Sequence, residues 1–211
     1  MYENIKNEIL FLNFKPGDSI KEKYFEEKFS VSRTPVREAF LKLKQEGLIE
    51  IFPQKGTFIS LIDINLIKQV YFLRKNLEVP ILKEIICIKE NKDFLFKLTQ
   101  IIEKQKYLIQ QNGKIEEIIL SDMEFHKEIF SFAQKQELWN FILSYFNDFI
   151  RIKVLTYKNF KMEKIINEHS LILKILENKN EEEIINYSNL HFSVAEIELN
   201  KVVQMYSDYF N

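Results

Sequence analysis

Three histidines and one aspartate are the side chains of this sequence whose types and spacing could bind a metal ion. The chain has three histidines, His126, His169 and His191. Each lies on the apolar stripe of its own expected helix, and Asp122 precedes His126 by one turn, so the two share a face. A carboxylate with three imidazoles suits a divalent zinc, nickel or manganese ion and leaves one or two positions for another ligand.

The apolar neighbours of these four residues define the inward faces. A single inward histidine is more often a core residue that one hydrogen bond satisfies, and this alternative stays open for each of them. Three inward histidines with an aspartate favour the metal site. The face of Asp122 and His126 also carries Ile118, Ile119, Phe125, Ile129 and Phe130. The face of His169 carries Ile165, Ile172 and Leu176, and the face of His191 carries Ile184, Tyr187, Val194 and the polar Glu198.

A second group of functional side chains lies between Lys28 and Gln45. This segment has five basic residues and one acidic residue, although the whole chain has 30 basic and 31 acidic side chains and a net charge of −1. A local basic patch on a near-neutral protein suits DNA binding, because cations neutralise phosphates and arginine forks read guanine edges. An ordinary solvated helix face is the alternative.

Three helices and a hairpin are expected to position this basic patch. Apolar residues recur at helical spacing from Ile5 to Leu12, a second short helix covers residues 21–29, and Thr34 is the expected N-cap of a third. In the third helix the core face carries Val36, Ala39, Phe40 and Leu43. Two β-runs, 48–52 and 57–61, flank the turn at 53–56, which completes a winged helix-turn-helix.

A shift in composition marks the second domain. After Gly56 the chain contains one proline, Pro80, and one glycine, Gly113. We therefore expect a winged helix-turn-helix over residues 1–62 and an all-helical bundle over 63–211. Its helices are expected at 63–90 with a kink at Pro80, 93–111, 115–132, 136–158, 162–177 and 181–204, the last of them capped by Asn180 and Glu183.

The composition excludes several protein classes. With 46% hydrophobic residues, four glycines and four prolines, the chain is not disordered and not a turn-rich β-sandwich. Cys87, the single cysteine, has no disulfide partner and is expected to be a buried apolar residue. The start of the chain lacks an apolar signal-peptide core, and the longest apolar stretch is too short to span a bilayer. We expect a soluble cytoplasmic protein without a membrane partner.

The order of residues in the first domain is specific. Residues 31–40 (VSRTPVREAF), Gly47 to Ile49 and residues 53–59 (PQKGTFI) resemble the DNA-binding domain of the GntR family of bacterial transcription regulators. The resemblance implies that Arg33 and Arg37 contact an operator, that the third helix enters the major groove and that Gly56 approaches the minor groove. The expected DNA-binding residues are Arg33, Thr34, Arg37, Lys44, Lys55 and Gly56.

The second domain carries its own signature. The element DMEFH at 122–126, followed by His169 and His191, resembles the metal-binding signature of the FCD effector domain, the C-terminal half of the FadR branch of GntR regulators. The resemblance implies a bundle of six or seven helices, with a metal bound by Asp122, His126, His169 and His191 and a small carboxylate effector completing its coordination.

Arg74 matches the arginine that this family has on its first bundle helix. It shares a stripe with apolar residues, so it should point inward and need a carboxylate partner. Glu78, one turn later, is the structural alternative for that partner, and an effector is the functional one. Asn147 and Arg151 are further candidates for the effector pocket.

These residues predict a transcription regulator that binds a palindromic operator in double-stranded DNA as a homodimer. Two alternatives stay open. The site Asp122, His126, His169 and His191 could serve a hydrolase-like metalloenzyme with Glu124 or Glu128 as base, although this leaves residues 31–40 unexplained. The metal could also be the signal itself. The sequence does not identify the effector, or say whether the protein is a repressor or an activator.

Overall fold

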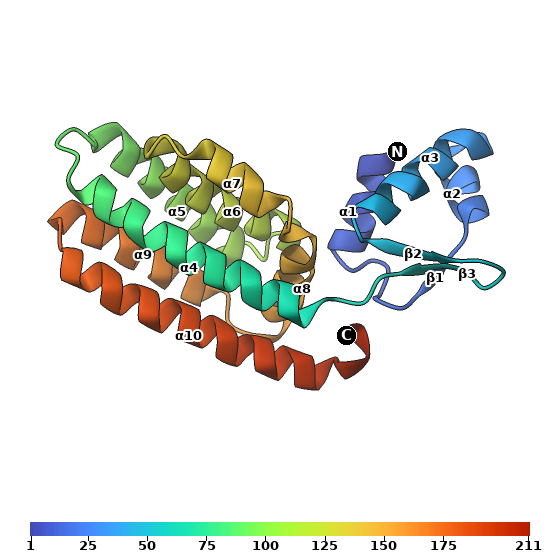
Figure 1. The fold of residues 1–211 in the computed structure, drawn as a ribbon. Coiled ribbons are helices and arrows are strands. Elements are labelled where there is room, and N and C mark those ends of the chain that lie inside the picture. The colour runs from blue at the N-terminus through green and yellow to red at the C-terminus, as the bar shows by residue number, and fades with distance from the viewer.

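The computed structural model describes the backbone of residues 1–211 and all side chains except those of Leu190, Ser193 and Val194. The expected place of Val194 on the His191 stripe therefore lies outside the described residues. Two domains lie end to end, a winged helix-turn-helix and an all-helical bundle (Figure 1). The predicted fold class is thereby confirmed.

The first domain packs three helices against a small sheet. Helices α1 (Tyr2–Leu10), α2 (Glu22–Phe29) and α3 (Arg33–Gln45) precede the hairpin of β2 (Ile49–Phe52) and β3 (Gly56–Ile59). A two-residue strand, β1 (Ser19–Ile20), pairs antiparallel with β3 and gives the order β1-β3-β2, with Glu50 opposite Phe58 in the hairpin. β1 was not predicted because two residues are too short for an alternating pattern.

Aromatic packing fixes α3 on this domain. The rings of Phe25 and Phe40 meet edge to face, with centroids 5.6 Å apart, and both side chains are buried. The helix begins at Arg33 with Ser32 as N-cap, so the expected N-cap at Thr34 is wrong by two residues. Pro35 is tolerated one turn deep because the first backbone N–H groups of a helix have no partner within it.

Seven helices form the bundle in the described backbone. They are α4 (Ile64–Ile86), α5 (Lys92–Gln110), α6 (Ile115–Phe132), α7 (Gln136–Leu143), α8 (Phe146–Asn159), α9 (Glu163–Asn178) and α10 (Glu181–Met205), and a 3₁₀ turn, η1 (Ser207–Tyr209), ends the chain. The Asp63 carboxylate caps α4 by accepting from the backbone N–H groups of Asn65 and Leu66, at 2.8 and 3.0 Å. Helix α4 continues through Pro80 to Ile86.

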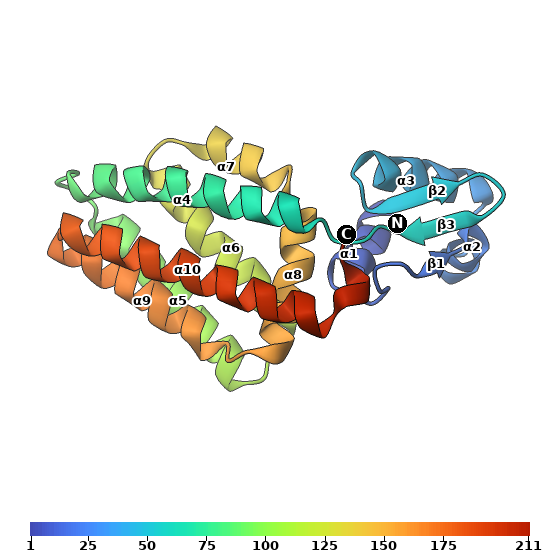
Figure 2. The ribbon, with the colours of Figure 1, turned by 60° about the horizontal axis from the view of Figure 1, so that its bottom comes forward.

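The single helix predicted over 136–158 is wrong, because the chain breaks between α7 and α8. The Ser144 hydroxyl donates to the Phe141 carbonyl at 2.6 Å, and the Tyr145 N–H turns back to the Ile142 carbonyl at 3.0 Å. These local bonds interrupt the regular i to i−4 ladder. The apolar pattern continues through the break, so the sequence contains no sign of it. Helix α8 lies across the end of the bundle next to the first domain (Figure 2).

Two further observations concern the surface of the bundle. Cys87 is exposed at the C-cap of α4, so its predicted burial is wrong; it follows the stripe of Ile81, Leu82 and Ile85 but falls off that face. Within the described chain, no helix combines the length and apolarity that crossing a bilayer requires.

Candidate metal centre and nucleic-acid interface

The expected DNA-contacting side chains all lie at the surface. Burial of Val36, Ala39, Phe40 and Leu43 against the domain core turns the opposite face of α3 to solvent. Arg33, Thr34, Arg37 and Lys44 are exposed on or beside that face. The Arg33 Nε donates to the Glu22 carboxylate on α2 at 2.8 Å, so one side of this guanidinium is already oriented.

The wing presents the other two candidates. Lys55 and Gly56 are exposed at the tip of the β2–β3 hairpin. Gly56 has φ +117°, a backbone conformation that residues with a Cβ rarely adopt. Apart from its chain neighbours, only the Phe58 ring lies within 4 Å of where a Cβ would be. A glycine here lets the backbone of the tip approach a neighbouring surface closely.

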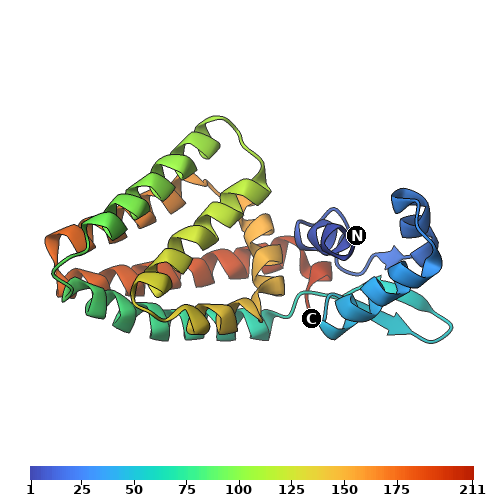
Figure 3. The ribbon, with the colours of Figure 1, turned by 90° about the horizontal axis from the view of Figure 1, so that it is seen from above.

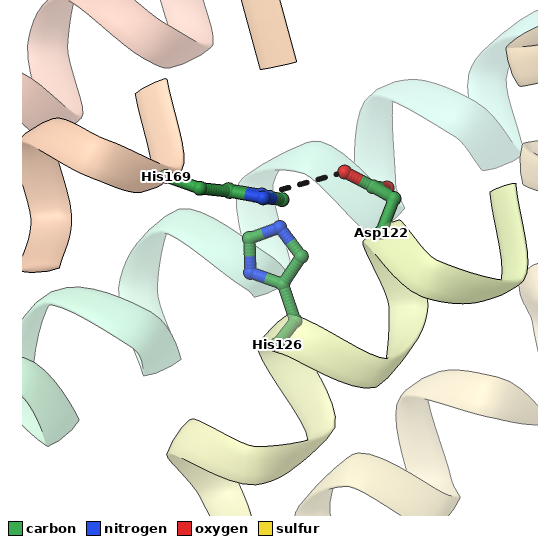
Figure 4. Close-up of side chains that lie close together, drawn as sticks. All are labelled: Asp122, His126 and His169. Atoms are coloured by element: carbon green, nitrogen blue, oxygen red, sulfur yellow. Dashed lines mark ion pairs between the residues drawn. The ribbon is translucent and has the colours of Figure 1, made fainter. Parts of the chain in front are cut away.

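The structure brings three of the four predicted metal ligands together (Figure 4). Asp122 and His126 stand one turn apart on α6, and His169 reaches them from α9. One ligand atom from each lies within 4.8 Å of the others. All three side chains are buried, so the group is part of the interior of the bundle.

Gln105 on α5 fixes the orientation of the His169 ring. The buried Gln105 amide donates to the Ser121 carbonyl at 3.0 Å, so its oxygen faces His169 Nδ1 at 2.8 Å and accepts from it. The remaining nitrogen, Nε2, then carries a lone pair and lies 3.5 Å from the Asp122 Oδ1 (dashed line in Figure 4). Two acceptors that face each other in a dry interior repel unless a cation lies between them, so this geometry fits a divalent metal ion.

A chain of ionic groups supports His126 from the other side. Arg74 on α4 donates through Nε to Glu78 Oε1 at 2.7 Å. Glu78 is the structural partner expected for Arg74 from the sequence. The other Glu78 oxygen lies 3.3 Å from His126 Nδ1, which forms no hydrogen bond with the described residues. Among the described residues, the buried Arg74 Nη2 has no hydrogen-bond partner, so Arg74 keeps one donor for another group.

The electrostatics keep the two inner histidines neutral and the two carboxylates ionised. Burial lowers the pKa of His126 and His169, and for His169 strongly. Burial alone would raise the pKa of Asp122, but the ammonium of Lys153, with a further contribution from the Arg74 guanidinium, holds it well below its usual range. Burial acts likewise on Glu78, whose pKa the Arg74 guanidinium holds low. Neutral imidazoles beside an ionised carboxylate are the forms that bind metal.

His191 stands apart from this group. Its Nδ1 lies 2.7 Å from the Glu168 carboxylate on α9, and its ring stacks on Tyr187. A narrow pocket between α8, α9 and α10 has His191, Glu168 and Lys153 in its wall. The structure therefore places the fourth predicted ligand outside the metal group, which consists of Asp122, His126 and His169, and in contact with a different carboxylate.

Asn147 and Arg151 contact the first domain. Asn147 donates to the carbonyl of Glu46, the C-cap of α3, at 3.1 Å. The fully buried Arg151 donates to the Ser60 and Leu61 carbonyls at 2.6 and 3.2 Å and pairs with Asp148. The structure thus places these two expected effector residues at the junction between the domains.

Three supporting residues were not identified as such from the sequence. Gln105 occupies a core position on the stripe of Leu98, Ile101 and Ile102, and a polar residue on such a stripe is the signal that could have found it. Glu78 was considered only as a partner of Arg74. Lys153 gave no signal, because a lysine in a helix usually faces solvent.

Comparison with known proteins identifies both parts of the chain. Residues 1–59 match the family described as "Bacterial regulatory proteins, gntR family", and residues 69–193 match the FCD domain. The HTH-type transcriptional repressor RspR of Escherichia coli K12 is 24% identical over 212 residues, covering 100% of this chain and 92% of that protein. An HTH-type transcriptional regulator of Bacillus subtilis, YdhC, is 28% identical over 194 residues, covering 91% and 86%.

Solved structures show the same fold. Escherichia coli McbR/YncC superposes with a TM-score of 0.69 at 20% identity, covering 99% of this chain and 96% of that one. A GntR transcriptional regulator from Rhodococcus sp. RHA1 gives 0.73 at 17% identity, covering 95% of each chain. At such identities the likeness extends to the arrangement of helices and to no particular ligand.

The buried histidines predict how stability depends on pH in the presence of a chelator. Because the folded-state pKa values of His126 and His169 lie below the ordinary 6.5, the stability that these groups contribute is present above that pH and is lost as the pH falls. We expect the free energy of unfolding, measured by urea denaturation, to fall between about pH 6.5 and 5 by up to ~1.4 kcal/mol per pH unit and histidine. The variant His169→Gln should have a shallower slope; equal slopes would contradict the neutral assignment.

Proposed function

This chain belongs to the GntR family of bacterial regulatory proteins and carries an FCD domain, and from that premise we propose that it binds an operator as a homodimer under the control of a small carboxylate held at a metal site. It is a transcription regulator with an FCD effector-binding domain. Its family and relatives are regulators and not enzymes, which sets the metalloenzyme alternative aside.

The exposed face of α3 supports the operator part of the proposal. Arg33 and Arg37 stand one turn apart at the start of the helix, where a recognition helix presents its side chains to base edges. Lys44, near the other end of α3, and Lys55 at the wing tip are placed to neutralise phosphates. Thr34 and Gly56 offer a hydroxyl and an accessible backbone to the same surface.

Apolar side chains at the surface support the homodimer. Leu138 and Phe141 on α7 and Tyr145 just after it are exposed, and the last two rings pack with centroids 5.4 Å apart. A contiguous exposed apolar patch commonly marks an association surface. A dimer with two recognition helices matches a palindromic operator, and one winged helix buries too little surface for tight specific binding.

The inner group supports the metal and effector part. Asp122, His126 and His169 would hold a zinc, nickel or manganese ion, and His191 would join them by leaving Glu168. Such an ion supplies a positive centre with coordination positions that a carboxylate can fill. Arg74 would pair with that carboxylate through the Nη2 that lacks a partner among the described residues.

Helix α8 connects this group to the DNA-binding domain. Its residues Asn147, Asp148 and Arg151 contact the first domain and the linker between the domains, residues 60–63. The Asp148 carboxylate accepts from the backbone N–H of Asp63 at 2.8 Å. Lys153, two residues further, lies 3.4 Å from Asp122. Since successive helical residues are about 100° apart, Arg151 and Lys153 lie on nearly opposite faces. Figure 3 shows α8 between the bundle and the winged helix.

Operator recognition is tested by substitution on α3. Replacing Arg33 or Arg37 with Ala should each cost about 1–3 kcal/mol of operator binding if it reads a base, whereas Lys158→Ala, an exposed change on α8, should cost nothing measurable. The operator would be selected from genomic DNA with purified protein and its affinity measured by fluorescence anisotropy. Unchanged affinity in both arginine variants, or a monomer that still protects a palindrome, would contradict the proposal.

Metal binding is tested by elemental analysis and thermal melting. Zinc, nickel or manganese at about 100 times its dissociation constant should stabilise the wild-type chain by ~2.7 kcal/mol through mass action. His169→Ala should abolish the shift, and His191→Ala should reduce it if His191 joins the metal. No bound metal and no shift in the wild type would reduce the histidines to core residues. Operator affinity that responds to metal alone would favour direct metal sensing.

The junction is tested with Arg151→Met. Allosteric coupling typically changes an affinity about 5–150-fold, and this variant should lose most of the effect of metal and carboxylate on operator affinity because the linker is no longer held. Its operator affinity in the absence of ligand should stay measurable, because α3 is unchanged. Lys158→Met, on the same helix but exposed, serves as the control. A variant that responds to ligand like the wild type would assign the coupling elsewhere.

A further inference from the structure

Lys153 is a nearly buried cation that lies next to Asp122 of the metal group. Its side chain is 15% exposed, and its ammonium lies 3.4 Å from Asp122 Oδ2 and 3.2 Å from the Tyr157 hydroxyl. The ammonium also lies 5.5 Å from the centre of the Phe149 ring. A lysine is seldom enclosed in this way without a partner for its charge.

The ionic groups around the three metal ligands are already balanced. Arg74 and Lys153 carry two positive charges, Glu78 and Asp122 carry two negative ones, and all four side chains are at most 15% exposed. A histidine that binds a metal through a ring nitrogen is neutral, so neither inner histidine adds a charge. A divalent ion bound here therefore brings two positive charges that no inner group compensates, and uncompensated charge in a bundle interior is costly.

The next layer of charges does not supply the missing balance. Lys164 pairs with Glu168 and Glu198, and Lys161 in the same pocket wall offsets the negative charge that remains. Lys161 is exposed and the other three side chains are between 18% and 34% exposed, so water and salt screen them more than the inner four. Compensation at the metal itself must come from an anion.

We infer that the site takes up its metal together with a dicarboxylate, which pairs with Lys153 at one end and with Arg74 at the other. This inference rests on the metal and effector site of the proposed function and specifies the charge of the effector. Both cations lie near one ring, the Arg74 guanidinium 5.3 Å and the Lys153 ammonium 5.5 Å from the centre of Phe149.

The two cations also have capacity for such a ligand. Arg74 Nη2 lacks a hydrogen-bond partner among the described residues. Lys153 has three donors, and it lines the pocket that contains His191. A monocarboxylate supplies one charge and reaches one of the two cations; a dicarboxylate supplies both charges and reaches both.

The test compares acids of equal length but different charge. Succinate and butyrate, and malonate and propionate, are titrated by calorimetry into nickel-loaded protein, with inorganic phosphate as a compact dianion that cannot span the two cations. The wild type should bind at least one dicarboxylate about tenfold or more tightly than its monocarboxylate partner, as expected for one additional charge-assisted contact. Phosphate should not share this advantage.

Substitutions at Lys153 separate its charge from its bulk. Lys153→Met should reduce the preference for the dicarboxylate to less than about threefold and should bind nickel alone more tightly than the wild type, because one nearby positive charge is gone. Lys153→Arg should keep the preference. Lys161→Met, an exposed lysine in the wall of the same pocket, should behave like the wild type.

Two results would overturn the inference, and they are distinguishable. If the wild type binds nickel but shows no preference for dicarboxylates, or if Lys153→Met keeps that preference, the role of Lys153 is wrong and the metal site stands. If the wild type binds no nickel, the metal site of the proposed function fails, and the inference fails with it. A preference for phosphate over both dicarboxylates would also overturn it.

Discussion

A charged side chain that is buried among helices needs a partner of opposite charge or a hydrogen-bond acceptor. Three buried cations and their partners determine how the parts of this molecule are arranged. Arg74 pairs with Glu78, Lys153 with Asp122, and Arg151 with Asp148 and the linker carbonyls. Removing one member of such a pair leaves the other uncompensated at a cost of about 3–5 kcal/mol. The Arg74 and Arg151 pairs each lie within one helix, whereas the Lys153–Asp122 pair joins α8 to α6. The first two pairs enclose the histidines, and the third joins the bundle to the DNA-binding domain.

The break between α7 and α8 makes this arrangement possible. A continuous helix over 136–158 would run along the bundle, whereas α8 crosses its end and touches both the metal group and the first domain. Three side chains of its first two turns reach the C-cap of the recognition helix, the end of the wing and the start of α4. A shift of α8 at the metal group would therefore act on all three of these points.

Much of the fold and part of the site could be read from the sequence because both rest on local patterns. The spacing of apolar residues predicted the helices, and the spacing of four residues predicted that Asp122 and His126 share a helix face. Contacts between helices carry no such periodicity. The apolar stripe could mark Gln105 as an inward residue, but the sequence does not show that it contacts His169 or that Lys153 contacts Asp122. Asn147 and Arg151 were expected in the effector pocket but contact the first domain. The sequence indicates that an inward polar residue needs a partner, but it does not indicate which partner.

Two helices, α8 and α10, hold the linker between the domains, and each also carries a side chain near the metal group. The buried Arg151 on α8 binds its Ser60 and Leu61 carbonyls. Ile62 forms a parallel bridge with Phe210, which follows α10, and its N–H donates to the Tyr209 carbonyl at 2.8 Å. Lys153 lies on α8 and His191 on α10. In the proposed metal and effector site, these are the two side chains that would change partners on binding. They belong to the two helices that hold one short linker, which begins where the wing ends.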